Sequence, residues 1–216
     1  MRISKRLKTI ADLIEEPTLV DVGCDHALLD IYCAKEKHLT CIASDCNRNA
    51  CKIACSNIQK YGLENEIQVY QTDGTKNIPM TENSTLVISG MGTSTILHIL
   101  KESKILPNQI ILQSNNHLEE LRRYLVQIGY YMEKEEIVKE KNIFNIILSC
   151  KKGIVSYDKF DYEIGPMIRK KRLEEKKDYL LFLIQNEKKI LDSLKENQKD
   201  YSIHKQKLEQ YKNELT

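Results

Sequence analysis

The chain has little aromatic character and no long apolar run. It contains no Trp and only three Phe among 216 residues, and no stretch reaches the about 20 consecutive apolar residues that a membrane-spanning helix needs. The N-terminal segment carries scattered charges and lacks the apolar core of a secretory signal. The composition, 41% hydrophobic and 30% charged, is typical of globular proteins. We therefore expect a soluble, cytoplasmic protein with no membrane partner.

The sequence also lacks the cysteine spacing of a zinc site. Its seven cysteines are odd in number, and no two of them form a CxxC pair. In a chain without a secretory signal, free thiols in a reducing compartment are the natural interpretation. Cys51 and Cys55 would share one helix face, which leaves a metal site as the alternative, although their spacing gives it little support. We predict buried free thiols and no metal.

Strands and helices are predicted to alternate five times along the chain before it closes with a hairpin. Apolar runs bounded by Gly, Asp and Pro predict strands, and apolar residues three and four apart predict helices. The expected strands are 18–23, 40–44, 66–71, 85–89, 109–112, 130–139 and 143–150, and the expected helices are 4–14, 28–37, 47–61, 94–101 and 118–128. This order predicts an α/β, Rossmann-like parallel sheet whose last strand enters antiparallel. Such an ending is typical of class I methyltransferases and atypical of nicotinamide dehydrogenases.

A heptad pattern marks the C-terminal part of the chain. Leu or Tyr stands at positions 173, 180, 194, 201, 208 and 215, and Ile184 and Leu191 stand four residues after the repeat positions 180 and 187, which indicates a coiled coil. Lys177 and Glu187 interrupt the seam, and the polar segment 196–202 is a candidate bend. We predict a coiled-coil helical hairpin within a monomer, with one long dimerising helix as the alternative. The expected domains are therefore 1–154, Rossmann-like, and 155–216, helical.

Basic residues are concentrated in this helical part. Residues 151–216 contain sixteen Lys and Arg against twelve Asp and Glu, whereas the rest of the chain contains seventeen against nineteen. The run Arg169-Lys170-Lys171-Arg172 is either a solvated helix face or a phosphate-binding surface.

The first strand leads into Val20-Asp21-Val22-Gly23-Cys24-Asp25-His26, a turn with a single glycine. Gly23 allows a ligand to approach the backbone, and the helix that follows offers unpaired N–H groups. A dinucleotide site usually has three glycines around the pyrophosphate, and here two are missing. S-adenosylmethionine has no phosphate, and Asp21 or Asp25 could pair with its ammonium group. The turn favours this cofactor, the alternative being a tight turn without a ligand.

Three later strands end in residues that suit the same ligand. Asp45 lies 22 residues after Gly23, where an acid can accept hydrogen bonds from ribose hydroxyls or can cap the next helix. Asp73-Gly74 follows the third strand, where a carboxylate could accept from an adenine amino group or form a plain turn. Ser89-Gly90-Met91-Gly92 follows the fourth strand, at the sheet edge where a reaction would occur.

Together these motifs resemble those of the bacterial tRNA (adenine-22 N1)-methyltransferases, the TrmK family. The resemblance covers essentially the whole chain and rests above all on Asp21–Ala27 and on Ile88-Ser89-Gly90-Met91-Gly92. It also includes Ser4-Lys5-Arg6-Leu7, Asp73-Gly74, Leu112-Gln113-Ser114-Asn115 and Gly165-Pro166. The chain departs from the family pattern at Cys24, Leu29, Asp30 and Ser114.

The resemblance implies methyl transfer from S-adenosylmethionine to N1 of adenine 22 in tRNA. Adenine N1 carries a lone pair, so the enzyme has to align and shield it, and a paired or stacked adenine must first be extruded. The catalytic candidates are His26, Gly90, Met91, Gly92 and Asn115. The cofactor candidates are Asp21, Gly23, Cys24, Asp25, His26, Asp45, Cys46, Asp73, Gly74, Ser89 and Gly90. The tRNA candidates are Arg6, Gln113, Asn115, Phe144, Arg169, Lys170, Lys171 and Arg172.

Several alternatives stay open at this point. The same fold could methylate another RNA base or a small molecule, although a small substrate gives no use for a basic helical arm. It could bind NAD, which the missing glycines oppose. It could also bind tRNA without catalysis, which the presence of Asp21, Asp45 and Asp73 opposes.

Overall fold

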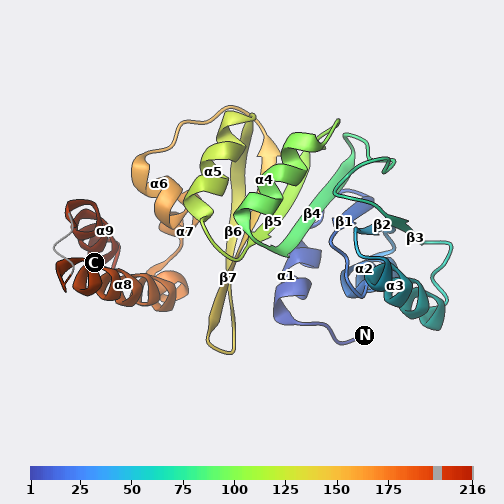
Figure 1. Cartoon of the computed structure of the whole chain (residues 1–216), viewed down its shortest axis with the longest axis horizontal. Coiled ribbons are helices and arrows are strands. Elements are labelled where there is room, and N and C mark those ends of the chain that lie inside the picture. The colour runs from blue at the N-terminus through green and yellow to red at the C-terminus, as the bar shows by residue number, and fades with distance from the viewer. Residues whose placement is uncertain (197–200, 216) are drawn as a thin grey trace. The chain divides into compact units, whose positions relative to one another are not determined.

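The computed structural model describes residues 1–196 and 201–215, and the chain divides into the units Met1–Ser156 and Tyr157–Thr216. One sheet runs through the first unit (Figure 1). Its strands are β1 (Thr18–Val22), β2 (Thr40–Asp45), β3 (Ile67–Gln71), β4 (Ser84–Met91), β5 (Gln109–Ser114), β6 (Tyr130–Glu140) and β7 (Ile143–Lys152). Their order is β3-β2-β1-β4-β5-β7-β6. Strands β1 to β5 are parallel, and β7 pairs antiparallel with both β5 and β6. The predicted sheet and its closing hairpin are confirmed.

Five helices belong to this unit. They are α1 (Lys5–Leu13), α2 (Leu28–Lys37), α3 (Arg48–Tyr61), α4 (Thr93–Glu102) and α5 (Leu118–Gln127). Local signals set several of their ends: the Ser4 hydroxyl accepts from the Leu7 N–H before α1, and Gly62 ends α3 with φ +66°. Residues 72–83 join β3 to β4 without a helix, as the predicted ranges have it, so the alternation of strands and helices is interrupted there.

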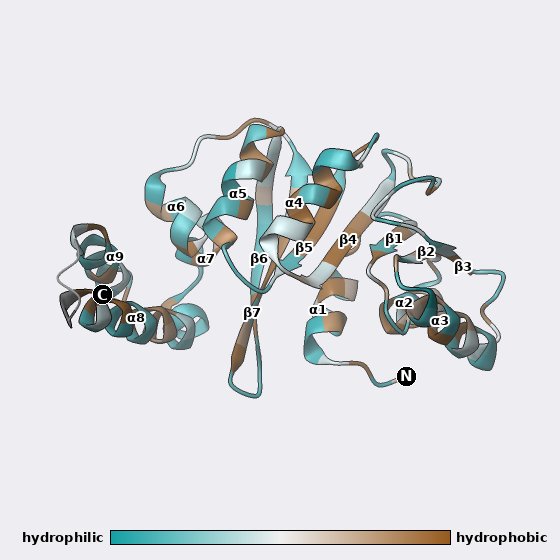
Figure 2. Ribbon diagram, viewed as in Figure 1, coloured by the Kyte–Doolittle hydropathy of each residue, from teal (hydrophilic) through white to brown (hydrophobic). Residues whose placement is uncertain are grey.

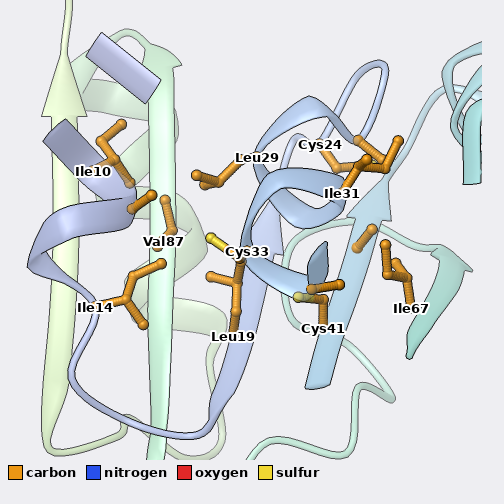
Figure 3. Packing of buried hydrophobic residues seen from close by; sticks show 14 of the residues in the cluster. Ile10, Ile14, Leu19, Cys24, Leu29, Ile31, Cys33, Cys41, Ile67 and Val87 are labelled. Carbon is orange, nitrogen blue, oxygen red and sulfur yellow. The ribbon is translucent and has the colours of Figure 1, made fainter. Parts of the chain in front are cut away.

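Helices cover both faces of the sheet. Successive residues of a strand point to opposite faces, so Val87 of β4 packs with α1 and α2, whereas Leu86 and Ile88 face the other side. The first face holds a cluster that includes Ile10, Leu19 and three thiols (Figure 3). These thiols are Cys24, Cys33 and Cys41, all buried and free. Burial raises the pKa of the Cys33 thiol to about 12, so these cysteines act as small apolar groups.

The second unit is helical. It contains α6 (Lys159–Ile164), α7 (Pro166–Lys170), α8 (Leu173–Glu196) and α9 (Ser202–Asn213), and α8 packs against α9. The predicted bend at 196–202 lies largely outside the described residues, since 197–200 are not among them. Among the described residues, no helix is long and apolar enough to cross a bilayer.

The packed seam of this helical unit differs in part from the heptad prediction. Leu180, Ile184 and Leu191 are buried as expected, but Leu173 and Tyr201 are 39% and 40% exposed. Glu187, the predicted interruption, is buried, and its carboxylate hydrogen-bonds His204 of α9. A polar pair thus replaces an apolar layer.

Candidate functional site

A cavity of about 350 Å³ opens at the carboxyl edge of the sheet. The ends of parallel strands meet at this edge, where ligands of doubly wound folds bind. Its walls come from α1, the β1–α2 turn, the end of β2 and the end of β4. The lining residues are Arg6, Leu7, Asp21, Gly23, Cys24, Asp25, His26, Leu28, Leu29, Asp45, Ser89, Gly90 and Met91. Most of the predicted cofactor residues are therefore brought together.

The β1–α2 turn holds a left-handed backbone at three positions. Gly23 has φ +80°, and Asp25 and Ala27 have φ +49° and +54°. The N–H groups of Gly23 and Cys24 both donate to the Ser44 carbonyl, at 2.8 and 3.0 Å. Left-handed conformations of Asp and Ala carry a cost of about 1–2 kcal/mol each and occur mainly where a site needs them. The turn is built to present its backbone to the cavity.

The Asp45 carboxylate orders the turn beside it. Its Oδ2 accepts from the Asp25 N–H at 3.3 Å, and its Oδ1 accepts from the Asn47 N–H at 2.8 Å. The N-cap of α3 is Asn47, which accepts from the N–H groups of Asn49 and Ala50. An ionised carboxylate has about four acceptor positions, so Asp45 retains capacity for hydroxyl donors from a ligand.

Two acids lie side by side beneath this turn. Asp21 is 6% exposed and Asp30 is fully buried, and each carboxyl group alters the pKa of the other. Among the described residues, no N–H or hydroxyl donor reaches either oxygen of Asp30. Burial raises the pKa of Asp21 to about 7. The charge of Asp45 also raises this pKa, whereas Asp30 and Arg6 lower it. Burial and the Asp21 charge raise the pKa of Asp30 well above its usual range, so Asp30 holds the proton that the pair shares.

The opposite wall of the cavity is a bulge in β4 held by β5. The β4–β5 register shifts between Ser89 and Met91, where Gly90 has φ +81°. Gln113 Oε1 accepts from the Gly90 N–H at 2.9 Å and from Arg6 Nη1 at 2.8 Å. Asn115 closes the loop by accepting from Gln113 Nε2 at 3.2 Å and donating to the Gly90 carbonyl at 3.0 Å. Gln113 and Asn115 therefore shape the Gly90 backbone.

Other predicted residues lie at the mouth of this cavity or outside its walls. The His26 side chain is about half exposed, 3.4 Å from the Asp25 carboxylate. Asp73 is exposed and accepts from Lys76 at 2.9 Å. Asp73, Gly74, Cys46, Gly92 and Phe144 are not among the lining residues. Asp30 was not among the predicted site residues, although an acid between the apolar residues Leu29 and Ile31 was a usable signal.

The predicted tRNA-contacting run of the helical unit is partly used for folding. Arg169 pairs with Asp158, Asp161 and Glu214 at 2.8, 2.6 and 2.8 Å. Arg172 is 75% exposed and pairs with Glu174 and Glu175, at the surface. Lys170 is exposed, and Lys171 is half-buried. The four residues thus have different roles, and Arg169 holds α6, α7 and the end of α9 together.

Comparison with known proteins shows the same architecture. Residues 3–148 match the family described as "Methyltransferase domain". The tRNA (adenine(22)-N(1))-methyltransferase of Bacillus subtilis (strain 168) is 30% identical over 175 residues, which cover 78% of this chain and 74% of that protein. A Streptococcus pneumoniae protein in complex with S-adenosyl-L-methionine has a TM-score of 0.87 at 28% identity, with 100% of both chains covered. M. capricolum TrmK in complex with the cofactor product S-adenosyl-homocysteine has a TM-score of 0.76 at 26% identity, with 100% and 95% covered.

Proposed function

Because the chain belongs to the methyltransferase domain family and, within it, to the TrmK family of tRNA (adenine-22 N1)-methyltransferases, we propose that it methylates N1 of adenine 22 in tRNA. The methyl donor is S-adenosyl-L-methionine. The observation that carries the proposal is the acidic, single-glycine cavity at the carboxyl edge of the sheet, which unites the ends of β1, β2 and β4.

The residues of this cavity fit the cofactor. A volume of about 350 Å³ lies within the range of about 300–1,000 Å³ usual for ligand sites. Gly23 has φ +80°, a conformation that glycine adopts without strain, and a Cβ there would meet the flexible end of Met91 at 2.2 Å. Asp45 has acceptor capacity left for ribose hydroxyls, and Asp21 can face an ammonium group.

The charge of the cavity fits as well. Among the lining residues that the structure describes, the acids Asp21, Asp25 and Asp45 stand against one permanent cation, which is Arg6. S-adenosylmethionine is cationic at its sulfonium, and N1-methyladenine is a cation, so an acidic cavity favours both the donor and the product. When bound, the cofactor supplies an electrophilic methyl group.

The remaining tasks belong to the protein. Adenine N1 already has a lone pair, so no side chain has to remove a proton before transfer. The chain has to fix the base in line with the methyl group and exclude water. We assign this positioning to the Gly90–Met91 backbone, which Gln113 and Asn115 hold in place. His26 and Asp25 lie at the cavity mouth, where they would contact the entering nucleotide.

The helical unit is proposed to bind tRNA outside the cavity, with Lys170 and Lys171 as candidates for phosphate contacts and Arg169 as an internal support. Its excess of cations supports this role. Packing of α8 on α9 within one chain supports a monomer. A tRNA substrate supports a cytoplasmic location.

A two-step experiment tests the proposed function. Calorimetric titration should show binding of S-adenosylmethionine and not of NADH. Purified protein should then transfer one methyl group to a tRNA transcript, with a reverse-transcription stop at adenine 22. A transcript with guanine at position 22 serves as the control and should accept none. Absence of cofactor binding, or a stop at another nucleotide, would refute the proposal.

A further inference from the structure

Helix α1 and the tip of the β6–β7 hairpin meet beside the cofactor cavity. The Arg6 N–H donates to Glu140 Oε1 at 3.0 Å, and Arg6 itself lines the cavity. Strand β5 stops pairing with β7 at Ile147, so the hairpin continues past the edge of the sheet. Figure 1 shows it extending beyond the neighbouring strands near α1. Helix α1 therefore lines the cavity, and the hairpin tip, which lines none of it, lies next to α1; the two elements are called here the rim.

This rim carries three exposed lysines on its two elements. Lys5 and Lys141 are the sequence neighbours of the two residues joined by the Arg6–Glu140 hydrogen bond, and Lys8 lies one turn along α1. All three, called here the rim lysines, are exposed. Within the described part of the chain, none of the three forms an ion pair. Lys76 and Lys151 of the same unit are paired with acids, whereas the exposed Lys60 and Lys104 form no ion pair among the described residues. The rim lysines are distinguished by their place beside Arg6 and Glu140.

The backbone at Lys141 gives an independent indication. Lys141 and Asn142 form the two-residue loop of the hairpin, and Lys141 has φ +55°. Such positions favour Gly, Asn or Asp, and another L-residue there is strained by about 1–2 kcal/mol. The turn itself gains nothing from a lysine. Figure 2 shows the turn as hydrophilic, although Ile143 beside it is 65% exposed.

The cavity and its rim have opposite charge. The acids Asp21, Asp25 and Asp45 inside would repel RNA phosphates, so the backbone of an entering nucleotide must be held outside them. Extrusion of a base requires such a hold, because unpairing and unstacking cost a few kcal/mol. Lysines at the mouth meet that need, since they attract phosphates while leaving the cavity to the base and the cofactor.

We propose that the rim lysines Lys5, Lys8 and Lys141 bind the RNA phosphates that flank the nucleotide inserted into the cavity. The inference rests on the proposed function and adds to it a second RNA-binding surface, on the catalytic unit. It assigns the rim to the phosphate backbone and not to base recognition, so the interactions are electrostatic and independent of sequence.

The test compares two double variants of the full chain. The rim variant is Lys5→Gln/Lys141→Asn, in which Asn tolerates the left-handed backbone at position 141. The matched control is Lys60→Gln/Lys104→Gln. Lys60 lies near the end of α3 and Lys104 follows α4, so both are exposed residues at the opposite edge of the sheet. Each protein is titrated with a tRNA transcript at several salt concentrations and, separately, with S-adenosylmethionine.

The rim variant should bind tRNA about tenfold more weakly, and the slope of log K against log salt should fall by about two, one for each lysine–phosphate pair removed. Its cofactor affinity should be unchanged, which also verifies its fold, and the control should match the wild type. An unchanged salt slope, with normal methylation by the wild type, overturns the rim assignment and leaves the proposed function intact. No methylation of tRNA by the wild type overturns the proposed function itself, and the rim assignment with it.

Discussion

The left-handed backbone at Gly23 shapes the wall of the cavity, and its importance for cofactor affinity can be measured. In Gly23→Ala the new methyl group meets the mobile end of Met91, so the main penalty comes from φ +80°. The variant should relax out of the left-handed region, and ligand binding has to reverse that change at a cost of about 1–2 kcal/mol. We expect cofactor affinity to fall about tenfold, measured by calorimetry.

A matched control distinguishes the effect of Gly23 on cofactor binding from the general cost of replacing a glycine that has positive φ. Gly62 has φ +66° at the end of α3, and a Cβ there would meet no atom within 4 Å. Gly62→Ala should therefore lower the thermal stability as Gly23→Ala does but leave cofactor affinity unchanged. Equal loss of affinity in both variants would show that Gly23 has no special part in the site.

The Asp21–Asp30 pair makes stability depend on pH. Both folded-state pKa values are raised above the about 3.9 of an unfolded Asp. Between these values the folded chain binds more protons than the unfolded chain, so the free energy of unfolding falls as pH rises. Asp30→Asn preserves the size and shape of the side chain and removes one of the two titrating groups. Its stability relative to the wild type should rise by about 1.4 kcal/mol per pH unit between pH 5 and 7.

Urea unfolding of both proteins at pH 5, 6 and 7 measures this difference. Asp12→Asn, an exposed acid of α1, is the control and should follow the wild type at every pH. Parallel curves for Asp30→Asn and the wild type would mean that Asp30 carries no proton in this range, contrary to the shared-proton assignment.

At the scale of residues, the sequence predicted only what the strand ends determine. Asp21, Gly23 and Asp45 converge because parallel strands finish at one edge, and a pattern of strands suffices to infer this. The same logic placed Asp73 at the cavity, yet the described structure pairs it with Lys76 on the loop after β3. The Asp30 pairing and the Arg6–Gln113 hydrogen bond depend on how α1 and α2 pack, which no local pattern specifies.

At the scale of elements, β5 supports the catalytic edge of β4 through one side chain. Gln113→Leu removes the acceptor shared by Arg6 and the Gly90 N–H. A buried donor left unpaired costs about 1–3 kcal/mol, so the bulge should lose its shape and the cofactor should bind at least tenfold more weakly. Gln113→Glu retains this acceptor but loses the Nε2 donor to Asn115, so its loss of affinity should be smaller than that of Gln113→Leu. Comparable losses in Leu and Glu variants would contradict a role in holding the bulge.

Helices α6 and α7 depend on Arg169 for their place against the end of α9. The side chain is 23% exposed, so the solvent screens its pairs only in part. Arg169→Gln should destabilise the helical unit by about 1–3 kcal/mol, seen as an earlier loss of helical circular dichroism. Arg172→Gln, at an exposed position of the same basic run, should change stability by less than about 0.5 kcal/mol. Equal losses of stability in the two variants would show that the ion pairs of Arg169 do not stabilise the helical unit.

The elements themselves were largely predictable, and the exceptions have physical reasons. Strands and helices of the first unit follow apolar periodicity, which burial enforces on both faces of the sheet. The heptad prediction placed Leu173 and Tyr201 in the seam, but both are largely exposed. A seven-residue repeat reports spacing along a helix and does not reveal which of its positions meet the short partner helix α9.

At the scale of the whole molecule, charge is distributed in a way that composition conceals. Residues 1–150 carry more acids than bases, which points away from RNA. In the structure, three acids and Arg6 line the cavity, and exposed lysines lie on its rim beside Glu140. Lys5 and Lys141 are far apart in the sequence, and the packing of α1 against β6 and β7, with the Arg6–Glu140 hydrogen bond, brings their surroundings together.

Removal of the helical unit measures how much each of the two proposed RNA-binding surfaces contributes to the affinity for tRNA. A chain that ends at Ser156 retains every residue lining the cavity. Its affinity for S-adenosylmethionine should therefore stay within about twofold of that of the full chain, a free-energy change of less than about 0.5 kcal/mol. Its affinity for tRNA should fall at least tenfold, because the cations of the helical unit are removed.

The shortened chain should still bind tRNA in a salt-dependent way, since the rim lysines remain on the catalytic unit. Adding Lys5→Gln/Lys141→Asn to the shortened chain should remove most of that salt dependence. If the shortened chain binds tRNA as tightly as the full chain, the helical unit has no docking role and the rim alone must supply the phosphate interactions.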